Sequence, residues 1–238
     1  GKALSMISDD GFFFEAKENY GPEMVTAFIR LNGMTVGCVA NRTEVLDEEN
    51  EKTAEYEPVL GARGCDKAAE FVSFCDAFNI PVLALVNVKG YKQSKCTERR
   101  IAKAAGRLTY AFANADVPKV TVVIGEAYGS AYVTMNSKSI GADIVYAWPD
   151  AKIGMMDAAA AVKIMYAEEI SASDKAAALI SEKAAEYEAL QSSAAAAAGR
   201  GYVDDIIKAD ETRQRVIAAF EMLFTKREGR PSRKHGTV

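Results

Sequence analysis

The sequence has little of the side-chain chemistry that metal sites and nucleophilic enzymes use. Its 238 residues include one histidine and four cysteines, and no two cysteines form a CxxC pair. The histidine, His235, is far in sequence from every cysteine. We therefore expect no metal site and no Ser–His–Asp or Cys–His nucleophile. Cys65 and Cys75 fall inside a helical pattern, which predicts buried thiols in a reducing, cytoplasmic compartment.

Long apolar runs and nucleotide-binding loops are also absent. No stretch reaches the ~20 apolar residues that span a bilayer, and the first residues lack the apolar core of a secretory signal. Neither GxGxxG nor GxxxxGK[ST] occurs, so a dinucleotide or P-loop site has no support. The formal net charge of -4 argues against a nucleic-acid partner, because such domains usually carry a basic patch.

Strand and helix patterns alternate along the chain. Met24–Leu31 and Met34–Asn41 flank Asn32-Gly33, a strong hairpin signal because both turn positions tolerate positive φ. Further strands are expected over 82–88, 119–125, 144–148 and 152–155, and helices over 65–78, 98–115, 130–140, 157–168, 171–191 and 211–228. The alanine run 194–198 is expected to cap or continue a helix. This alternation predicts βαβ crossovers in one α/β domain whose C-terminal third is helical.

Two segments lack a clear periodicity. Thr43 to Pro58 is strongly acidic, and we interpret it as a solvated loop. The segment 229–238 is basic and is expected to be loose. Its cations could meet the phosphates of a coenzyme, although a solvated end or a subunit contact is the simpler interpretation. These cations are Arg230, Arg233 and Lys234 within the segment, together with Lys226 and Arg227 just before it.

The most informative local pattern is IGEAYGSAY at 124–132, which predicts a strand end, a tight turn and a helix start. The first N–H groups of a helix have no intrahelical partner, and small residues let a substrate oxygen approach them. Gly129, Ser130 and Ala131 therefore form a candidate oxyanion hole made of backbone donors. The alternative is structural: Gly129 permits close helix–sheet packing, and Ser130 is an N-cap.

A second candidate segment follows the strand expected over 82–88. It consists of Val88, Lys89, Gly90 and Tyr91. Loops at the carboxyl ends of parallel strands are where α/β proteins bind ligands. The alternative is a strand-terminating glycine beside an exposed lysine. Asp157 is expected to be a helix N-cap.

Several segments, in order along the chain, resemble acyl-CoA carboxyltransferase subunits such as the β subunit of propionyl-CoA carboxylase. They are CDAFNIP at 75–81, VPKVTV at 117–122, GEAYGSAYVTM at 125–135, GAD at 141–143, YAWP at 146–149, GRGYVD at 199–204 and KHG at 234–236. The resemblance implies an α/β, crotonase-like ββα superhelix. The family's full subunit contains two such domains, and residues 1–238 resemble the second, biotin-side domain, without the acyl-CoA-side domain.

The resemblance also implies a reaction, which is carboxyl transfer between biotin on a carrier protein and a coenzyme A thioester. In this family biotin supplies the base, while the protein supplies two oxyanion holes and positioning. The N–H groups of Ser130 and Ala131 would then hold the biotin ureido oxygen. The implied biotin-binding residues are Val88, Lys89, Gly90, Tyr91, Tyr132 and Val133. The implied partners are the acyl-CoA-side domain, the biotin carrier protein and further copies of the chain.

The sequence departs from the family pattern at three places. The family's GGA is Gly129-Ser130-Ala131 here, its YD is Tyr132-Val133, and its DVPGFLPG is NVKGYKQS at 87–94. The aspartate replaced by Val133 lies where the carboxylases select the acyl chain, so propionyl specificity does not follow. These departures favour the decarboxylase branch, in which malonyl- or methylmalonyl-CoA donates the carboxyl group. A membrane sodium pump then removes that group from biotin, so any membrane contact is indirect.

Two alternatives remain open at this point. One is a crotonase-like assembly module that docks partner subunits and performs no chemistry. The other is a stand-alone crotonase-type hydratase or isomerase, which needs acid–base carboxylates near the oxyanion hole. Glu126 is close enough in sequence to serve as such a carboxylate.

Overall fold

The computed structural model describes residues 1–46, 49 and 51–228. The basic segment 229–238, with His235 and the KHG segment, lies outside the described residues. Among those residues, no helix combines the length and the apolar character that a bilayer crossing demands.

The described chain is built around a sheet of eight strands in the order β1-β2-β3-β7-β9-β10-β12, with β11 also paired to β9. The strands are β1 (Phe13–Glu15), β2 (Met24–Leu31), β3 (Met34–Asn41), β7 (Val82–Val88), β9 (Lys119–Tyr128), β10 (Ile144–Ala147), β11 (Lys152–Gly154) and β12 (Asp205–Ile206). β1, β2 and β3 are antiparallel, and the remaining pairs are parallel. The Asn32-Gly33 turn is confirmed, with φ of 51° and 79°.

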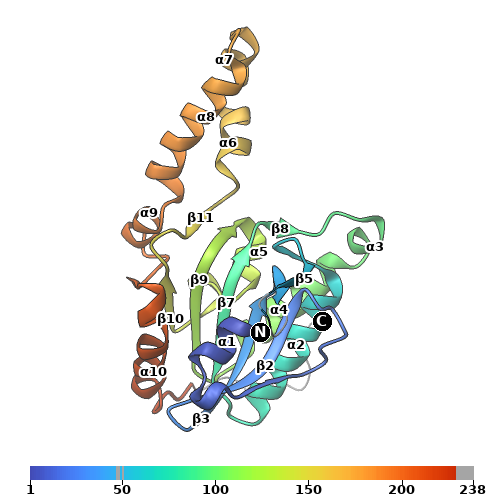
Figure 1. Cartoon of the computed structure of the whole chain (residues 1–238), viewed down its shortest axis with the longest axis vertical. Helices are drawn as coiled ribbons and strands as arrows, with labels where there is room; N and C mark the ends of the chain where they lie inside the picture. Colours follow the sequence, from blue (N-terminus) through green and yellow to red (C-terminus); the bar gives the residue numbers. More distant parts are fainter. Residues whose placement is uncertain (47–48, 50, 229–238) are drawn as a thin grey trace.

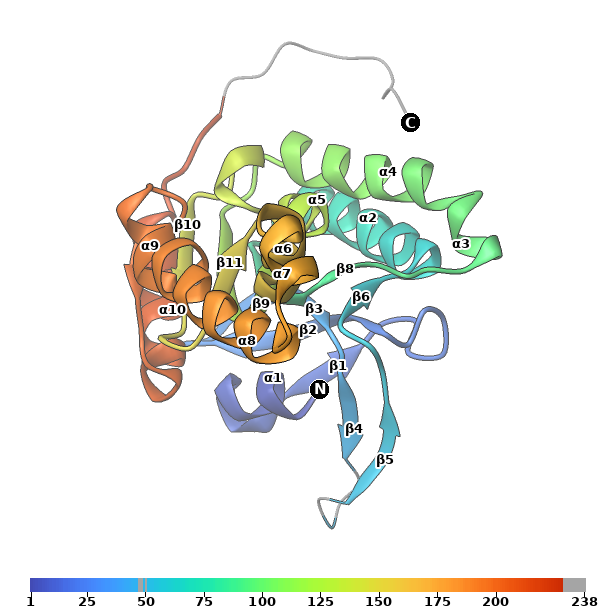
Figure 2. The ribbon, with the colours of Figure 1, turned by 90° about the horizontal axis from the view of Figure 1, so that it is seen from above.

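Helices cover both faces of this sheet. α2 (Ala62–Ala77) and α4 (Ile101–Asn114) pack on one face, and α1 (Lys2–Ile7) and α10 (Thr212–Met222) pack on the other (Figure 2). β7 shows why two cores form, because Val82, Ala84 and Val86 point to the first face while Leu83 and Leu85 point to the second. A strand that is apolar on both faces is typical of the centre of a parallel sheet.

The prediction of a loop over Thr43–Pro58 was wrong. β4 (Glu44–Leu46) and β5 (Lys52–Glu55) form an antiparallel ribbon in which Val45 pairs with Ala54. Lys52 Nζ lies 3.8 Å from a Glu44 oxygen and 3.1 Å from a Glu55 oxygen, so one cation offsets two carboxylates. Both faces of the ribbon are largely solvated, and its sequence therefore lacks the apolar alternation that marks a half-buried strand.

Four expected helices are interrupted. The helix expected over 157–168 breaks at Tyr166, and the helix expected over 171–191 breaks at 173–175. The helix expected over 98–115 is α3 (Lys95–Glu98) followed by α4, and the Ser94 hydroxyl caps α3 by accepting from the Thr97 N–H at 3.2 Å. The helix expected over 130–140 is α5 (Gly129–Thr134) and a 3-10 turn, η2 (Lys138–Ile140). Asn136 at φ 59° separates them, because a left-handed residue cannot continue a right-handed helix.

A helical arm projects from the body (Figure 1). It consists of α6 (Ala158–Met165), α7 (Ala167–Ala172) and α8 (Ala176–Tyr187). Asp157 caps α6 as expected, because its carboxylate accepts from the Ala160 N–H at 3.1 Å. α7 and α8 contain no buried residue. The chain then passes through η3 (Glu188–Ser192) into α9 (Ala194–Gly199), the helix expected from the alanine run.

The buried thiols are confirmed. Cys38, Cys65 and Cys75 are buried and free, and Cys96 is exposed. Burial is the main cause that raises the pKa of the Cys65 thiol and of the Cys75 thiol from 9.0 to about 12. These thiols are packed as small apolar side chains.

We expect the Cys65 thiol to make the chain less stable at alkaline pH. Its folded-state pKa of about 12 lies above the unfolded value of 9.0. The unfolded chain therefore loses this proton first, and the stabilisation is complete below pH 9 and disappears as the pH rises toward 12. Urea unfolding of the wild type and of Cys65→Ala between pH 7 and 11 measures this contribution. The difference between the two curves should shrink above pH 9, and a constant difference would contradict the assignment.

Candidate functional site

The carboxyl end of β9 turns sharply into α5. Tyr128 is extended, with φ of -117°, and Gly129 follows at φ 57°. A Cβ atom on Gly129 would lie 3.0 Å from the carbonyl oxygen of Met155, which follows β11. Because β11 pairs alongside β9 up to Gly154 and Tyr128, that carbonyl is fixed against the turn. Both the backbone angle and the space therefore require glycine at this position.

The first turn of α5 has no side-chain cap. The structural alternative for Ser130 is wrong, since the N-cap position belongs to Tyr128 and the Ser130 side chain is exposed beyond it. Ala131 is 1% exposed and anchors the helix in the core. The early N–H groups of a helix have no intrahelical acceptor. This turn therefore offers backbone donors at the surface, at the end of a strand held in the centre of the sheet.

The second candidate segment lies against α5. Gly90 and Tyr91 form the short strand β8, which pairs with β6 (Val59–Leu60). The Tyr91 hydroxyl lies 3.1 Å from the Thr134 hydroxyl, which in turn donates to the Ser130 carbonyl at 3.0 Å. The structure thus brings together two segments that are about forty residues apart, as expected for the carboxyl ends of neighbouring parallel strands.

Lys89 and Glu126 form an ion pair between the same two segments. The Lys89 Nζ lies 3.0 Å from a Glu126 carboxylate oxygen, and the lysine side chain is 53% exposed. An ion pair this exposed contributes little to stability, so its main effect is to join the end of β7 to β9. Glu126 is the carboxylate that a stand-alone hydratase would use as its acid or base.

The remaining expected site residues are less accessible. Val88 is fully buried in the core, so it can offer only its backbone to a ligand. Tyr132 is 8% exposed, and its hydroxyl has no hydrogen-bond partner among the described residues. Burial, followed by the nearby Asp204 charge, raises the pKa of Tyr132 to about 12. Val133 is half-buried. The accessible group therefore consists of Gly129 and Ser130 with Lys89, Gly90 and Tyr91.

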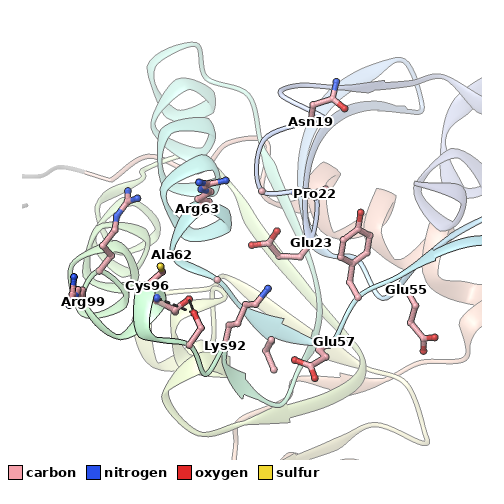
Figure 3. Close-up of a pocket in the computed structure, with 17 residues that line it drawn as sticks. Asn19, Pro22, Glu23, Glu55, Glu57, Ala62, Arg63, Lys92, Cys96 and Arg99 are labelled. Carbon is pink, nitrogen blue, oxygen red and sulfur yellow. Dashed lines mark hydrogen bonds between the residues drawn. The ribbon is translucent and has the colours of Figure 1, made fainter.

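A cavity of about 840 Å³ with charged residues in its walls begins at Lys92, one residue beyond Tyr91 (Figure 3). Its walls come from the segments 19–23, 55–63 and 92–100, and Lys92 directly follows β8. Glu23, Glu57, Arg63 and Lys92 all line it. Within the described part of the chain, Arg63 and Lys92 form no ion pair. A lining of this kind suits a polar, charged ligand.

Sequence reasoning missed this cavity for a simple reason. Its walls come from three separate segments, and one of them, 55–63, begins in the acidic stretch that we had interpreted as a loop. None of these segments contains a motif. Only the pairing of β6 with β8 brings Val59 beside Gly90 and so places the segments 55–63 and 92–100 together.

Comparison with known proteins identifies the family of this chain. The sequence model of the carboxyl transferase domain matches residues 2–238. The chain belongs to the carboxyl transferase domain family. It is 42% identical over 234 residues to the methylmalonyl-CoA carboxyltransferase 12S subunit of Propionibacterium freudenreichii subsp. shermanii, covering 98% of this chain and 43% of that subunit. It is 39% identical over 236 residues to the methylmalonyl-CoA decarboxylase subunit alpha of Propionigenium modestum, covering 99% of this chain and 44% of that subunit.

Solved structures of carboxyltransferases also match this chain. The crystal structure of transcarboxylase 12S, described as a hexamer assembly with methylmalonyl-coenzyme A and methylmalonic acid bound, matches with a TM-score of 0.89 and 41% identity. The match covers 99% of this chain and 44% of that one. The β subunit of geranyl-CoA carboxylase from P. aeruginosa, at 22% identity and a TM-score of 0.76, shares the fold. The crotonase-like α/β fold is confirmed. This carboxyl transferase domain spans less than half the length of the curated relatives it matches.

Proposed function

We propose that this domain is the biotin-side half of an acyl-CoA carboxyltransferase. It contributes one backbone oxyanion hole to a site that a second, acyl-CoA-side domain completes. The observation that carries the proposal is the Gly129 turn, which presents the uncapped start of α5 beside Lys89 and Tyr91. The match covers 43% of the 12S subunit, which leaves room in that relative for a second domain.

The residues present fit biotin. When bound, biotin supplies the carboxyl carrier and the base. A ureido carbonyl that gains negative charge is stabilised by preorganised N–H donors, and the N–H groups of Ser130 and Ala131 would hold that oxygen. Tyr91 braces α5 from the side through Thr134. The domain then needs no base of its own.

The proposed substrate is an acyl-CoA of the malonyl or methylmalonyl class. The 12S structure holds methylmalonyl-coenzyme A, and the Propionigenium modestum relative is a methylmalonyl-CoA decarboxylase subunit. Val133 stands where the carboxylases of the family have an aspartate, which favours a donor of this class over propionyl-CoA. The proposed partners are a biotin carrier protein and further copies of the chain, as in the hexamer described for transcarboxylase 12S.

Reconstitution tests this function. The domain is mixed with the recombinant acyl-CoA-side half of the 12S relative, biocytin and methylmalonyl-CoA, and decarboxylation is followed. We expect turnover in the complete mixture and none when either half is omitted, because each half carries one of the two oxyanion holes. Absence of turnover with several partner halves and several acyl-CoAs would overturn the proposal. Hydratase activity of the domain alone would instead establish the stand-alone crotonase-type enzyme.

A further inference from the structure

β9 contains an irregularity immediately before the site. β7 and β9 pair in register from Val82 and Lys119 to Val86 and Val123, and the next pair is Val88 with Ala127. Between these pairs β7 advances by two residues and β9 by four, so β9 bulges opposite Asn87. Bulges of this kind are found next to active sites, where they redirect the strand that carries the functional groups.

The Asn87 side chain fills the gap that the bulge opens. Its Oδ1 atom accepts from the Glu126 N–H at 3.0 Å, so a side-chain amide replaces the backbone carbonyl that regular pairing would supply. Gly125 makes room for it, since a Cβ atom there would lie 2.7 Å from the same oxygen. Asparagine at 87 and glycine at 125 are therefore interdependent.

A further side chain holds Asn87 from the opposite side. The backbone N–H of Asn87 donates to the Asn41 Oδ1 at 3.2 Å, and Asn41 ends β3. The bonds thus run in one line across three adjacent strands, β3, β7 and β9. The position of the bulge is fixed from the interior of the sheet and does not depend on the exposed loop that follows β8.

The bulge also lies where β9 changes partner. Before it, residues 120–123 of β9 pair with β10, and after it residues 126–128 pair with β11. Ile124 and Gly125 pair with neither strand. The part of β9 beyond the bulge therefore takes its direction from β11, from the Val88–Ala127 pairing with β7 and from the Asn87 bond, and it leads through Tyr128 directly into the Gly129 turn.

We propose that Asn87 is a positioning residue of the carboxyl transfer site, which through the Glu126 N–H sets where the Ser130 and Ala131 donors and the Lys89–Glu126 pair lie. The inference rests on the proposed function for its catalytic consequence. Its structural consequence is the placement of the backbone from Glu126 to Ala131. This placement does not rest on the proposed function and can be measured in the domain without any ligand.

Three variants separate this role from general stability. Asn87→Leu has nearly the same size but no acceptor, Asn87→Asp keeps an acceptor oxygen, and Gly125→Ala pushes the amide out of place. Thr26→Val is the matched control, because it also removes one side-chain to backbone bond in the same sheet, to the Ala16 carbonyl at 2.9 Å. All four are compared with the wild type in thermal unfolding and in 15N-resolved amide spectra.

The amide spectra of the ligand-free domain give the first answer. Asn87→Leu and Gly125→Ala should shift the amides of Ser130 and Ala131, whereas Asn87→Asp and Thr26→Val should leave these two amides near their wild-type positions. Wild-type positions in Asn87→Leu, or equal shifts in the leucine and aspartate variants, would overturn the positioning role. This result does not depend on turnover, so it remains informative if reconstitution fails and the proposed function is abandoned.

Kinetics of the reconstituted enzyme give the second answer. We expect Asn87→Leu to lower kcat by about 10- to 100-fold with little change in the KM for the acyl-CoA, because misplaced donors cost transition-state stabilisation. Asn87→Asp should recover most of the rate. A fall in kcat that follows thermal stability equally in Asn87→Leu and Thr26→Val would show a merely structural residue and would overturn the proposal.

Discussion

Replacing Gly129 with alanine is expected to lower the kcat of the reconstituted carboxyltransferase by about 100- to 1,000-fold, which is the usual effect of losing one oxyanion-hole donor. The added Cβ atom would lie 3.0 Å from the Met155 carbonyl oxygen at a φ of 57°. The carbonyl belongs to backbone that β11 holds against β9, so the turn must move instead. The N–H groups that follow in Ser130 and Ala131 then point away from the position of the substrate oxygen.

Gly201→Ala is the matched control for this variant. Gly201 also has a positive φ, 78°, but nothing lies within 4 Å of its added Cβ atom. Both substitutions therefore introduce a similar backbone strain of about 1–2 kcal/mol. Only Gly129→Ala also displaces the N–H donors of Ser130 and Ala131. Steady-state kinetics and thermal unfolding are measured for both. Equal activity in the two variants would remove the Gly129 turn from the mechanism.

The second large effect concerns stability. Replacing Glu15 with alanine is expected to lower the free energy of unfolding by about 3–5 kcal/mol. Glu15 on β1 contacts the Arg42 guanidinium, and one of its oxygens lies 3.7 Å from the Lys67 Nζ. The exposed fractions of the Glu15, Arg42 and Lys67 side chains are 6%, 9% and 0%. Removing the Glu15 carboxylate leaves the buried Arg42 and Lys67 cations without the negative charge that compensates them.

The electrostatics of Lys67 support this expectation. Burial lowers the pKa of Lys67, and the Glu15 charge is the largest influence that raises it again. The control is Glu70→Ala, which breaks a Glu70–Lys17 pair whose side chains are 66% and 51% exposed and which should cost less than about 1 kcal/mol. Urea unfolding measures both. Similar losses in the two variants would mean that solvent reaches the Glu15 cluster.

Much of the fold follows from local pattern. β2, β3 and β7 have the bounds expected from their β-branched runs, and Asn-Gly supplies the turn between the first two. These segments are predictable because each is buried over most of its length and its composition reflects that burial. The β4–β5 ribbon was missed because it is largely solvated on both faces. The break between α3 and α4 was missed because it falls at Arg99 and Arg100, and neither is a glycine or proline that would mark it.

Some features of the candidate site could likewise be predicted from local sequence, and others could not. The positions of Gly129, Ser130 and Tyr91 near strand ends were predictable, because small residues and loops there have a recognisable pattern. The burial of Val88 and Tyr132 was not, since it depends on which way a strand or a short helix faces the core. The Asn87–Gly125 pair was also hidden, because a two-residue register shift leaves no signature in either strand alone.

The arm formed by α6, α7 and α8 has a thermodynamic consequence for the whole chain. α7 and α8 bury no residue, and Ile164 and Met165 on α6 are 69% and 62% exposed. Within the arm, buried residues occur only in α6, and α7 and α8 are held by alanine-rich propensity and by packing on α6. We therefore expect opening of the arm to cost less than unfolding the body. The free energy of local unfolding is therefore lower for the arm than for the body. A molecule that binds the folded arm and not the unfolded arm would raise the arm's free energy of unfolding by mass action, without contacting the sheet that positions the site.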